Sequence, residues 1–205
     1  ERQTLKPQVP EITVLRIGTS GAAQGDIEPG TLGISSYALG LDSTGLYFDV
    51  PVVDETAGLL EQRAKTLIDE ATDEACRFSG TIHPYATRAT PELVARLEER
   101  ARAAGLPVAT GVTVAAPGFY GASGRNIEPL KLTVPGIKEV CSAVEANGHR
   151  VINFEMESSL IFLLAQALGW RAATICPIIS NPKRHDVVID YGPVVSAAID
   201  LMVGL

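Results

Sequence analysis

Two carboxylates stand one residue apart at the start of a long apolar run. Glu155 and Glu157 flank Met156, and the run over residues 160–168 that follows contains no charged side chain. A helix this apolar is buried around most of its circumference, so the charged residues before it face either solvent or a cleft. The residues alone allow two interpretations. In one, Asn153 caps the helix and both glutamates complement its dipole; in the other, one glutamate binds the hydroxyl groups of a substrate.

A glycine-bearing turn is the second candidate for chemistry. Arg16 lies in an apolar segment that predicts a strand over residues 11–18, and Thr19 and Gly21 follow it. Glycines let backbone N–H groups converge on an anion, and Thr19 adds a hydroxyl donor. The guanidinium group of Arg16 offers a planar fork that matches a phosphate. A plain glycine-rich turn after a strand is the alternative interpretation.

A loop predicted over residues 116–126 is the third candidate. It contains one proline and three glycines, with Phe119 and Tyr120 as a stacking surface and Arg125 as a cation. Loops that follow the strands of an α/β sheet are common places for binding sites. The residues alone equally allow Phe119 to fill the core and Arg125 to be a surface charge.

The composition is that of an ordinary globular protein, and it excludes several classes. Of the 205 residues, 46% are hydrophobic and 20% are charged, and the formal net charge is −7. This charge argues against a nucleic-acid surface, so local arginines and backbone donors must hold any anionic substrate. Cys76, Cys141 and Cys176 form neither a metal-binding spacing nor an even disulfide set, which indicates a reducing compartment. No run could span a bilayer and no secretory signal opens the sequence, so we expect a cytoplasmic protein.

Strands alternate with helices along the chain. Apolar runs predict strands over residues 11–18, 31–36, 108–115, 151–153 and 172–180. Helical spacing predicts helices over residues 59–76, 91–104 and 160–168, and a last helix from residue 191 onward. The last helix is expected to bury one face, made of Val194, Val195, Ala198, Ile199, Met202 and Leu205. The alternation predicts a single-domain, three-layer α/β/α fold with a mainly parallel or mixed sheet.

Several residues mark the expected ends of these elements. Thr90 is predicted to cap the helix that Pro91 opens, and Gly105 is predicted to stop it. Gly169 is predicted to end the apolar helix in the same way. Residues 181–186 are polar, and we expect them to form a mobile loop.

Three separated segments resemble motifs of one family, the nucleoside phosphorylases, in that family's order. Residues 16–21 resemble its phosphate-binding loop, and residues 153–159 resemble its ribose-binding signature. Residues 118–125 resemble the base-binding segment of the uridine phosphorylase branch. The resemblance implies a nucleoside phosphorylase-like fold whose central mixed sheet is partly barrel-like. It also implies phosphorolysis, in which phosphate and a pyrimidine ribonucleoside, uridine first, give a free base and ribose 1-phosphate.

The resemblance assigns site residues to each ligand. Phosphate is assigned to Arg16, Gly18, Thr19 and Gly21; ribose to Glu155, Met156 and Glu157; the base to Phe119, Ser123, Arg125, Phe154 and Ile179. Arg16, Thr19, Glu157 and Arg125 would carry catalysis, and Arg125 would stabilise negative charge on the departing base. On a regular helix Glu155 and Glu157 would point to nearly opposite sides, so Glu157 is favoured as the ribose ligand. No metal or cofactor is implied, because inorganic phosphate is a co-substrate.

Two features depart from the family pattern. Ser123 stands where the uridine branch usually has Gln, whose side chain offers uracil a paired donor and acceptor. Residues 1–10 read as a polar linker, and nothing in them matches an earlier glycine-rich phosphate loop of the family. We therefore expect one domain over residues 11–205, either as a fragment of the full domain or as a product whose leading part is absent.

The sequence leaves alternatives for the substrate and for the oligomeric state. Purine-cleaving relatives place Asp after the Ser that matches Ser180, whereas Asn181 follows here. An amide cannot deliver a proton to a purine, so this position favours a pyrimidine. The alternatives are a purine nucleoside phosphorylase, a hydrolytic nucleosidase on the same fold and a non-catalytic nucleoside-binding protein. The family implies a homodimer or a larger assembly of dimers that binds nucleoside and phosphate, but neither nucleic acid nor membrane.

Overall fold

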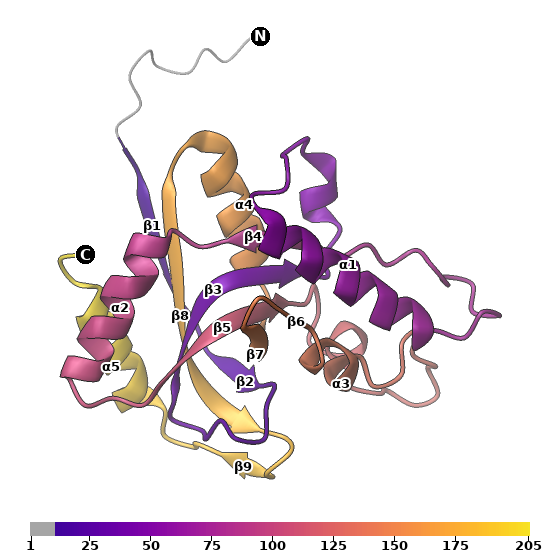
Figure 1. The fold of residues 1–205 in the computed structure, drawn as a ribbon. Coiled ribbons are helices and arrows are strands. Elements are labelled where there is room, and N and C mark those ends of the chain that lie inside the picture. The colour runs from indigo at the N-terminus through magenta and orange to yellow at the C-terminus, as the bar shows by residue number, and fades with distance from the viewer. Residues whose placement is uncertain (1–10) are drawn as a thin grey trace, which may run out of the picture.

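The structure is a computed structural model that describes residues 11–205 (Figure 1). The linker expected over residues 1–10 lies outside the described residues. The strands are β1 Thr13–Ile17, β2 Ser20–Ala22, β3 Leu32–Gly40, β4 Tyr85–Arg88, β5 Val108–Ala115, β6 Glu145–Ala146, β7 His149–Glu155, β8 Arg171–Asn181 and β9 Asp186–Val187. The α-helices are α1 Glu55–Glu70, α2 Pro91–Ala103, α3 Ile137–Ser142, α4 Ser158–Leu168 and α5 Gly192–Met202, with short 3-10 helices η1 Thr44–Tyr47 and η2 Gly121–Ser123.

Five of the strands close into a barrel. Strand β8 pairs with β2, β2 with β7, β7 with β5, β5 with β3, and β3 pairs back onto β8. The length of β8 allows this closure, because its first half pairs with β1 while its second half turns toward β2 and β9. Pairings are parallel and antiparallel in the same sheet. The predicted α/β/α fold with a mixed, partly barrel-like sheet is confirmed.

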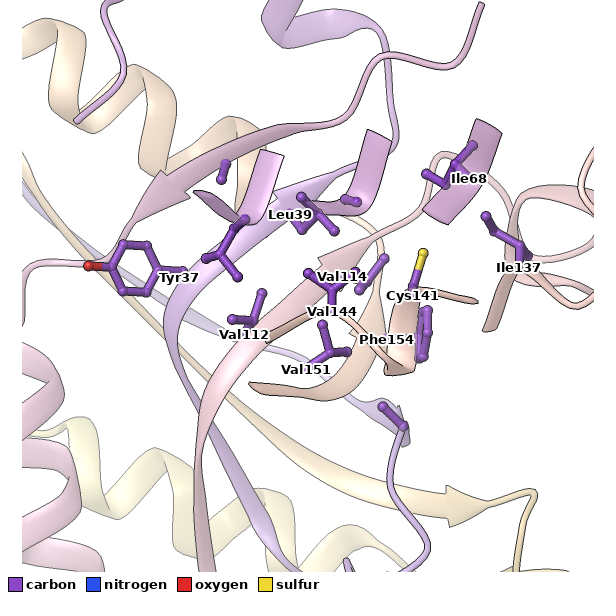
Figure 2. Close-up of a cluster of buried hydrophobic side chains, with 14 of the residues drawn as sticks. Tyr37, Leu39, Ile68, Val112, Val114, Ile137, Cys141, Val144, Val151 and Phe154 are labelled. Atoms are coloured by element: carbon purple, nitrogen blue, oxygen red, sulfur yellow. The ribbon is translucent and has the colours of Figure 1, made fainter. Parts of the chain in front are cut away.

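Helices cover the sheet on two sides (Figure 1). Helices α2 and α5 pack together on one side, and α1 and α3 pack together on the other. Side chains alternate between the faces of a strand, so β3 serves both layers. Tyr37 and Leu39 belong to the core under α1 and α3, whereas Ile34 and Ala38 belong to the core under α2, α4 and α5. Figure 2 shows the first of these cores, where strand side chains meet Ile68 of α1.

Glycine and cap positions agree with the sequence at most element ends. Strand β5 spans the predicted residues, and α2 begins at Pro91. Gly105 and Gly169 follow α2 and α4 with φ near +68°, a conformation that glycine adopts without a steric penalty. Thr90 occupies the N-cap position, but its hydroxyl accepts the Ala172 N–H of β8 at 2.9 Å and does not cap the helix. The threonine therefore ties α2 to the sheet.

Other boundaries differ from the predictions. The helix expected over residues 59–76 runs over Glu55–Glu70, because Asp54 caps it by accepting the Ala57 N–H at 2.8 Å. The strand expected over residues 31–36 continues to Gly40, since both of its faces are covered. The segment expected as a mobile loop over residues 181–186 is a tight turn between the paired strands β8 and β9.

The buried face of the last helix is also rotated from the predicted one. Ile199 is 46% exposed, whereas Leu201, which the pattern left out, is buried together with Ala198 and Met202. Within residues 11–205, no helix is both long enough and apolar enough to cross a membrane.

Candidate functional site

The two carboxylates lie at the junction of β7 and α4, and neither lies inside the helix. The interpretation of Asn153 as the helix cap is wrong, because Asn153 is a fully buried residue of β7. Its amide donates to Ser20 Oγ at 2.9 Å and accepts from Thr113 Oγ1 at 2.7 Å. Glu155 takes the capping role instead, since its carboxylate accepts the N–H groups of Glu157 and Ser158, each at 3.0 Å.

Arg16 holds both carboxylates. Its Nη2 lies 2.9 Å from Glu155 Oε2 and also pairs with Glu157 Oε2. Its Nη1 donates to the Sγ atom of Cys176 at 3.0 Å. The argument from helical geometry, which gave the two glutamates separate directions, therefore fails. The residue assigned to phosphate and the residue assigned to ribose form an ion pair with each other.

Burial sets the electrostatics of this cluster. The Glu155 side chain is 1% exposed and the Arg16 side chain 15%, whereas Glu157 is 54% exposed. Burial raises the pKa of Glu155, and the nearby Arg16 cation opposes that change. Burial also raises the pKa of Cys176 to about 12, so its neutral thiol sulfur accepts the Arg16 hydrogen bond. Of the three acceptors around Arg16, only Glu157 is free to move into solvent.

Gly18 makes this arrangement possible. A Cβ atom at position 18 would lie 2.6 Å from Arg16 Nη1, closer than two such atoms can approach. The Arg16 side chain therefore folds back across Gly18 to reach Glu155 and Cys176. A larger residue at position 18 would have to displace the guanidinium end of the Arg16 side chain.

A cavity of about 360 Å³ lies beside the cluster and brings segments of the three motifs together. Its lining includes nine of the assigned residues: Thr19, Gly21, Phe119, Ser123, Arg125, Phe154, Glu155, Met156 and Ile179. Arg16, Gly18 and Glu157 do not line it, and Arg16 reaches it only through Glu155. A larger hollow of about 900 Å³ between residues 71–78 and 126–136 contains no assigned residue.

One end of the cavity is formed by the loop that carries Phe119. We call it the base end, after the ligand to which the resemblance assigns this loop. The Arg125 guanidinium carbon lies 3.7 Å from the centroid of the Phe119 ring, and its Nη1 donates to the Phe119 carbonyl oxygen at 2.6 Å. Phe119 is 56% exposed, so it does not fill the core. Ser123 is buried, and its hydroxyl donates to the Gly118 carbonyl oxygen at 2.6 Å. The loop thus uses part of its own donor capacity to hold its shape.

Asn181 lies outside the cavity and has a structural role. Its Nδ2 donates to the carbonyl oxygens of Gln24 and Ile27 at 2.9 and 2.7 Å, and its Oδ1 accepts the Lys183 N–H at 3.0 Å. The side chain is fully buried. These bonds use both N–H groups of the amide, so none is left for a substrate.

Sequence reasoning missed four lining residues: Ser20, Lys138, Ser180 and Val187. Ser20 and Ser180 are neighbours of assigned residues, and the polar ends of paired strands were a usable signal for them. Lys138 lies on α3, which no sequence pattern placed near the other segments. Cys176, which contacts Arg16, was read only as a free thiol.

Comparison with known proteins shows the family to which the chain is similar. The sequence model of the Phosphorylase superfamily matches residues 12–197. The chain is 27% identical to the uridine phosphorylase of Haemophilus influenzae over 175 residues, which cover 85% of this chain and 56% of that protein. It is 26% identical to the uridine phosphorylase of Thermococcus kodakarensis over 180 residues, covering 85% and 50%.

A solved structure is similar as well. It is a Trypanosoma brucei nucleoside phosphorylase described as showing uridine phosphorylase activity, with a TM-score of 0.74 and 27% identity. The match covers 92% of this chain and 60% of that one. The chain spans about half the length of the curated relatives it matches.

Proposed function

The chain belongs to the phosphorylase superfamily, and we propose that it cleaves a pyrimidine ribonucleoside, uridine first, with phosphate to give the free base and ribose 1-phosphate. One observation carries this proposal. A single cavity is lined by residues assigned to phosphate, ribose and base, although these residues come from four distant segments of the chain. A binding site for two substrates that react with each other requires that proximity.

Phosphate is proposed to bind at the Thr19 end, next to Arg16. Thr19, Ser20 and Gly21 line the cavity, and Arg16 lies behind Glu155. Phosphate would compete with the exposed Glu157 for the Arg16 guanidinium, which is suited to a bidentate contact with either anion. Occupation by phosphate would therefore release Glu157 toward the ribose hydroxyls.

Ribose is proposed to lie between Met156 and the released Glu157. Met156 lines the cavity and is 42% exposed, so it offers an apolar surface to the sugar. Glu155 is committed to Arg16 and to two backbone N–H groups, which leaves Glu157 as the freer hydroxyl acceptor.

The chemistry needs no carboxylate nucleophile. Breaking the bond between C1′ and the base nitrogen leaves positive charge on the sugar, and the phosphate anion both stabilises that charge and forms the new C1′–O bond. The electron pair of the broken bond stays on the base. Arg125 is placed to stabilise this negative charge, and Phe119 bounds the same end of the cavity.

A pyrimidine is proposed over a purine because Asn181 stands where purine-cleaving relatives carry an Asp, and an amide cannot deliver a proton. A purine departs readily only when its N7 is protonated or hydrogen-bonded. Asn181 has both N–H groups bonded to backbone carbonyls. Negative charge on departing uracil spreads onto its carbonyl oxygens, and nearby cations can stabilise these oxygens without any proton transfer.

We extend the proposal to the organisation of the protein. Residues 11–205 act as one nucleoside phosphorylase-like domain, the protein assembles as a homodimer or a larger assembly of dimers, and it works in the cytoplasm. No metal or cofactor is proposed, since phosphate supplies the nucleophile.

A product assay tests the function. The full chain is incubated with uridine, thymidine or inosine, with and without phosphate, and free base and ribose 1-phosphate are quantified. We expect uridine cleavage that requires phosphate and a kcat/KM for uridine above that for inosine. Equal base release without phosphate favours a hydrolase, a uridine-to-inosine ratio below one favours a purine enzyme, and nucleoside binding without turnover favours a binding protein.

A further inference from the structure

We propose that Lys138 is a base-recognition residue, whose ammonium group donates a hydrogen bond to a carbonyl oxygen of the base and stabilises its negative charge as it departs. This inference rests on the proposed function and deepens it. Lys138 lies on α3 and lines the same cavity as Ser123 and Arg125. Nothing in the three sequence motifs includes it.

Among the residues at the base end, Lys138 has the most hydrogen-bond donors still available. The Ser123 hydroxyl already donates to Gly118, and Arg125 already uses one N–H group on Phe119. The Lys138 ammonium carries three N–H groups. Within residues 11–205 it makes no hydrogen bond or ion pair, so all of its donor capacity faces the cavity or solvent.

The charges at this end also call for an anionic or carbonyl-rich ligand. Partial burial lowers the pKa of Lys138, the nearby Arg125 cation lowers it further, and the Glu139 carboxylate opposes both. The Lys138 ammonium nitrogen lies 5.9 Å from the centroid of the Phe154 ring, which lines the cavity. The repulsion between two like charges that line one cavity is reduced when an anion binds between them.

The substrate class follows from this chemistry. A base with two carbonyl oxygens flanking a ring nitrogen gives an acceptor to each cation, and its departing anion spreads charge onto both oxygens. The bond from C1′ to the base breaks, its electron pair moves onto the base, and Lys138 keeps its proton as a donor throughout. Lys138 thus replaces the amide that Ser123 lacks, and the proposed class is the pyrimidine-2,4-dione nucleosides.

Variants of two lysines in the same region test the inference. Lys138→Met keeps the length of the side chain but removes its charge and donors. Lys138→Arg restores both, and Lys131→Met is the matched control, since Lys131 is exposed and does not line this cavity. Steady-state rates are measured with uridine and with 5-fluorouridine, whose base is more acidic and needs less stabilisation.

We expect Lys138→Met to lower kcat/KM for uridine by about ten- to a hundredfold, the range for losing a charge-assisted hydrogen bond. The loss should be smaller for 5-fluorouridine, the KM for phosphate should stay unchanged, and Lys138→Arg should recover most of the rate. The melting temperature should not fall, because repulsion with Arg125 is relieved. Rates equal to those of Lys131→Met, or equal losses for both nucleosides, would overturn the role of Lys138.

Binding of the free base separates this inference from the proposed function. Calorimetric titration with 5-fluorouracil in mildly alkaline buffer needs no turnover. Tighter binding to the wild-type protein than to Lys138→Met supports the inference even if no nucleoside is cleaved. Equal affinities, or no binding to the wild-type protein, contradict it.

Discussion

The two ends of the cavity differ in whether their cationic side chains are paired with carboxylates. At the sugar–phosphate end, the Arg16 guanidinium meets the carboxylates of Glu155 and Glu157 and the sulfur of Cys176. At the base end, Arg125 and Lys138 lie near each other, and no carboxylate within residues 11–205 comes within 4 Å of either. The cation at one end is paired with carboxylates of the chain itself, whereas the two cations at the other end are not.

This difference predicts different responses to ligands. An anion at the sugar–phosphate end must displace an internal partner, and the half-exposed Glu157 is the one that can leave. A base at the other end need displace nothing, because Arg125 commits only Nη1 to Phe119 and the Lys138 ammonium group has no ion-pair partner within residues 11–205. Binding at the first end is therefore coupled to a rearrangement of side chains, whereas binding at the second end adds contacts to a site that is already formed.

The largest effect is expected from Arg16→Ala, which removes the cation that pairs with the two carboxylates at the sugar–phosphate end. Removing Arg16 leaves the Glu155 carboxylate, 1% exposed, without its cation. We expect a loss of about 3 kcal/mol in the free energy of unfolding, near the lower end for breaking a buried pair, because two backbone N–H groups still hold Glu155. Phosphate use should weaken by about ten- to a hundredfold. Urea unfolding and the phosphate dependence of the rate measure the two effects.

Arg171→Ala is the matched control for this variant. Arg171 pairs with Glu11 at 2.9 Å on the surface, where both side chains are largely exposed. Its loss should cost about 0–1 kcal/mol and leave phosphate use unchanged. Equal stability losses for the two arginine variants would mean that the Arg16 cluster is not buried in solution.

A smaller effect is expected from Glu157→Ala, which removes the movable partner of Arg16. Uridine kcat/KM should fall by about tenfold or more, because hydrogen bonds to the sugar strengthen in the transition state. A 2′-deoxy substrate should lose less. Phosphate binding measured without nucleoside should tighten a few-fold, since its competitor for Arg16 is gone.

The Glu157→Gln variant sharpens this test. It keeps a hydrogen-bond acceptor for the ribose but weakens the pair with Arg16, so phosphate binding should tighten while uridine loses less than with alanine. If the ribo- and deoxyribonucleosides lose equally in Glu157→Ala, Glu157 only supports the start of α4 and is not a ribose ligand.

The smallest effect is expected from Ser123→Gln at the base end. The substitution gives up the hydroxyl bond to Gly118, which costs about 1 kcal/mol of stability. Relative rates for uridine, thymidine and inosine should change by a few-fold to about tenfold, because an amide enters the base end, while the phosphate KM stays the same. Ala122→Gln is the control, since Ala122 does not line this cavity. Unchanged base preference in Ser123→Gln would show that position 123 does not contact the base.

Local features of the site could be predicted from sequence because each belongs to one short segment. Thr19 and Gly21 follow a strand, Met156 lies at a strand–helix junction, and Phe119 and Arg125 share one loop. Resemblance of these short segments to family motifs therefore suggested a binding role, whereas their residue types alone left a structural role open. The apolar runs and their stop residues similarly predicted the mixed α/β architecture, because burial on two faces requires continuous apolar strands.

Predictions failed where a polar residue found its partner far along the chain. Asn153 looks like a helix cap, but its buried amide bonds to Thr113 and Ser20, which are 40 and 133 residues away. Asn181 stands where purine-cleaving relatives carry an Asp, but it does not line the cavity, and its amide bonds to the backbone of residues 24 and 27. Local spacing gives no information about such partners, and a buried polar group takes whichever partner the fold brings within reach.

The sequence by itself determined which short segments carry the candidate residues for an anion, a sugar and a flat base, because each segment resembles a family motif. Only the tertiary structure decided how these residues pair. The pairing of β1 with β8 places Arg16 so that it reaches Glu157 and Cys176, which are 141 and 160 residues away, and α3 brings Lys138 into the cavity that Arg125 lines. Charge pairing depends on distance in space, which the order of residues does not encode, so the cation at one end is paired with carboxylates and the cations at the other end are not.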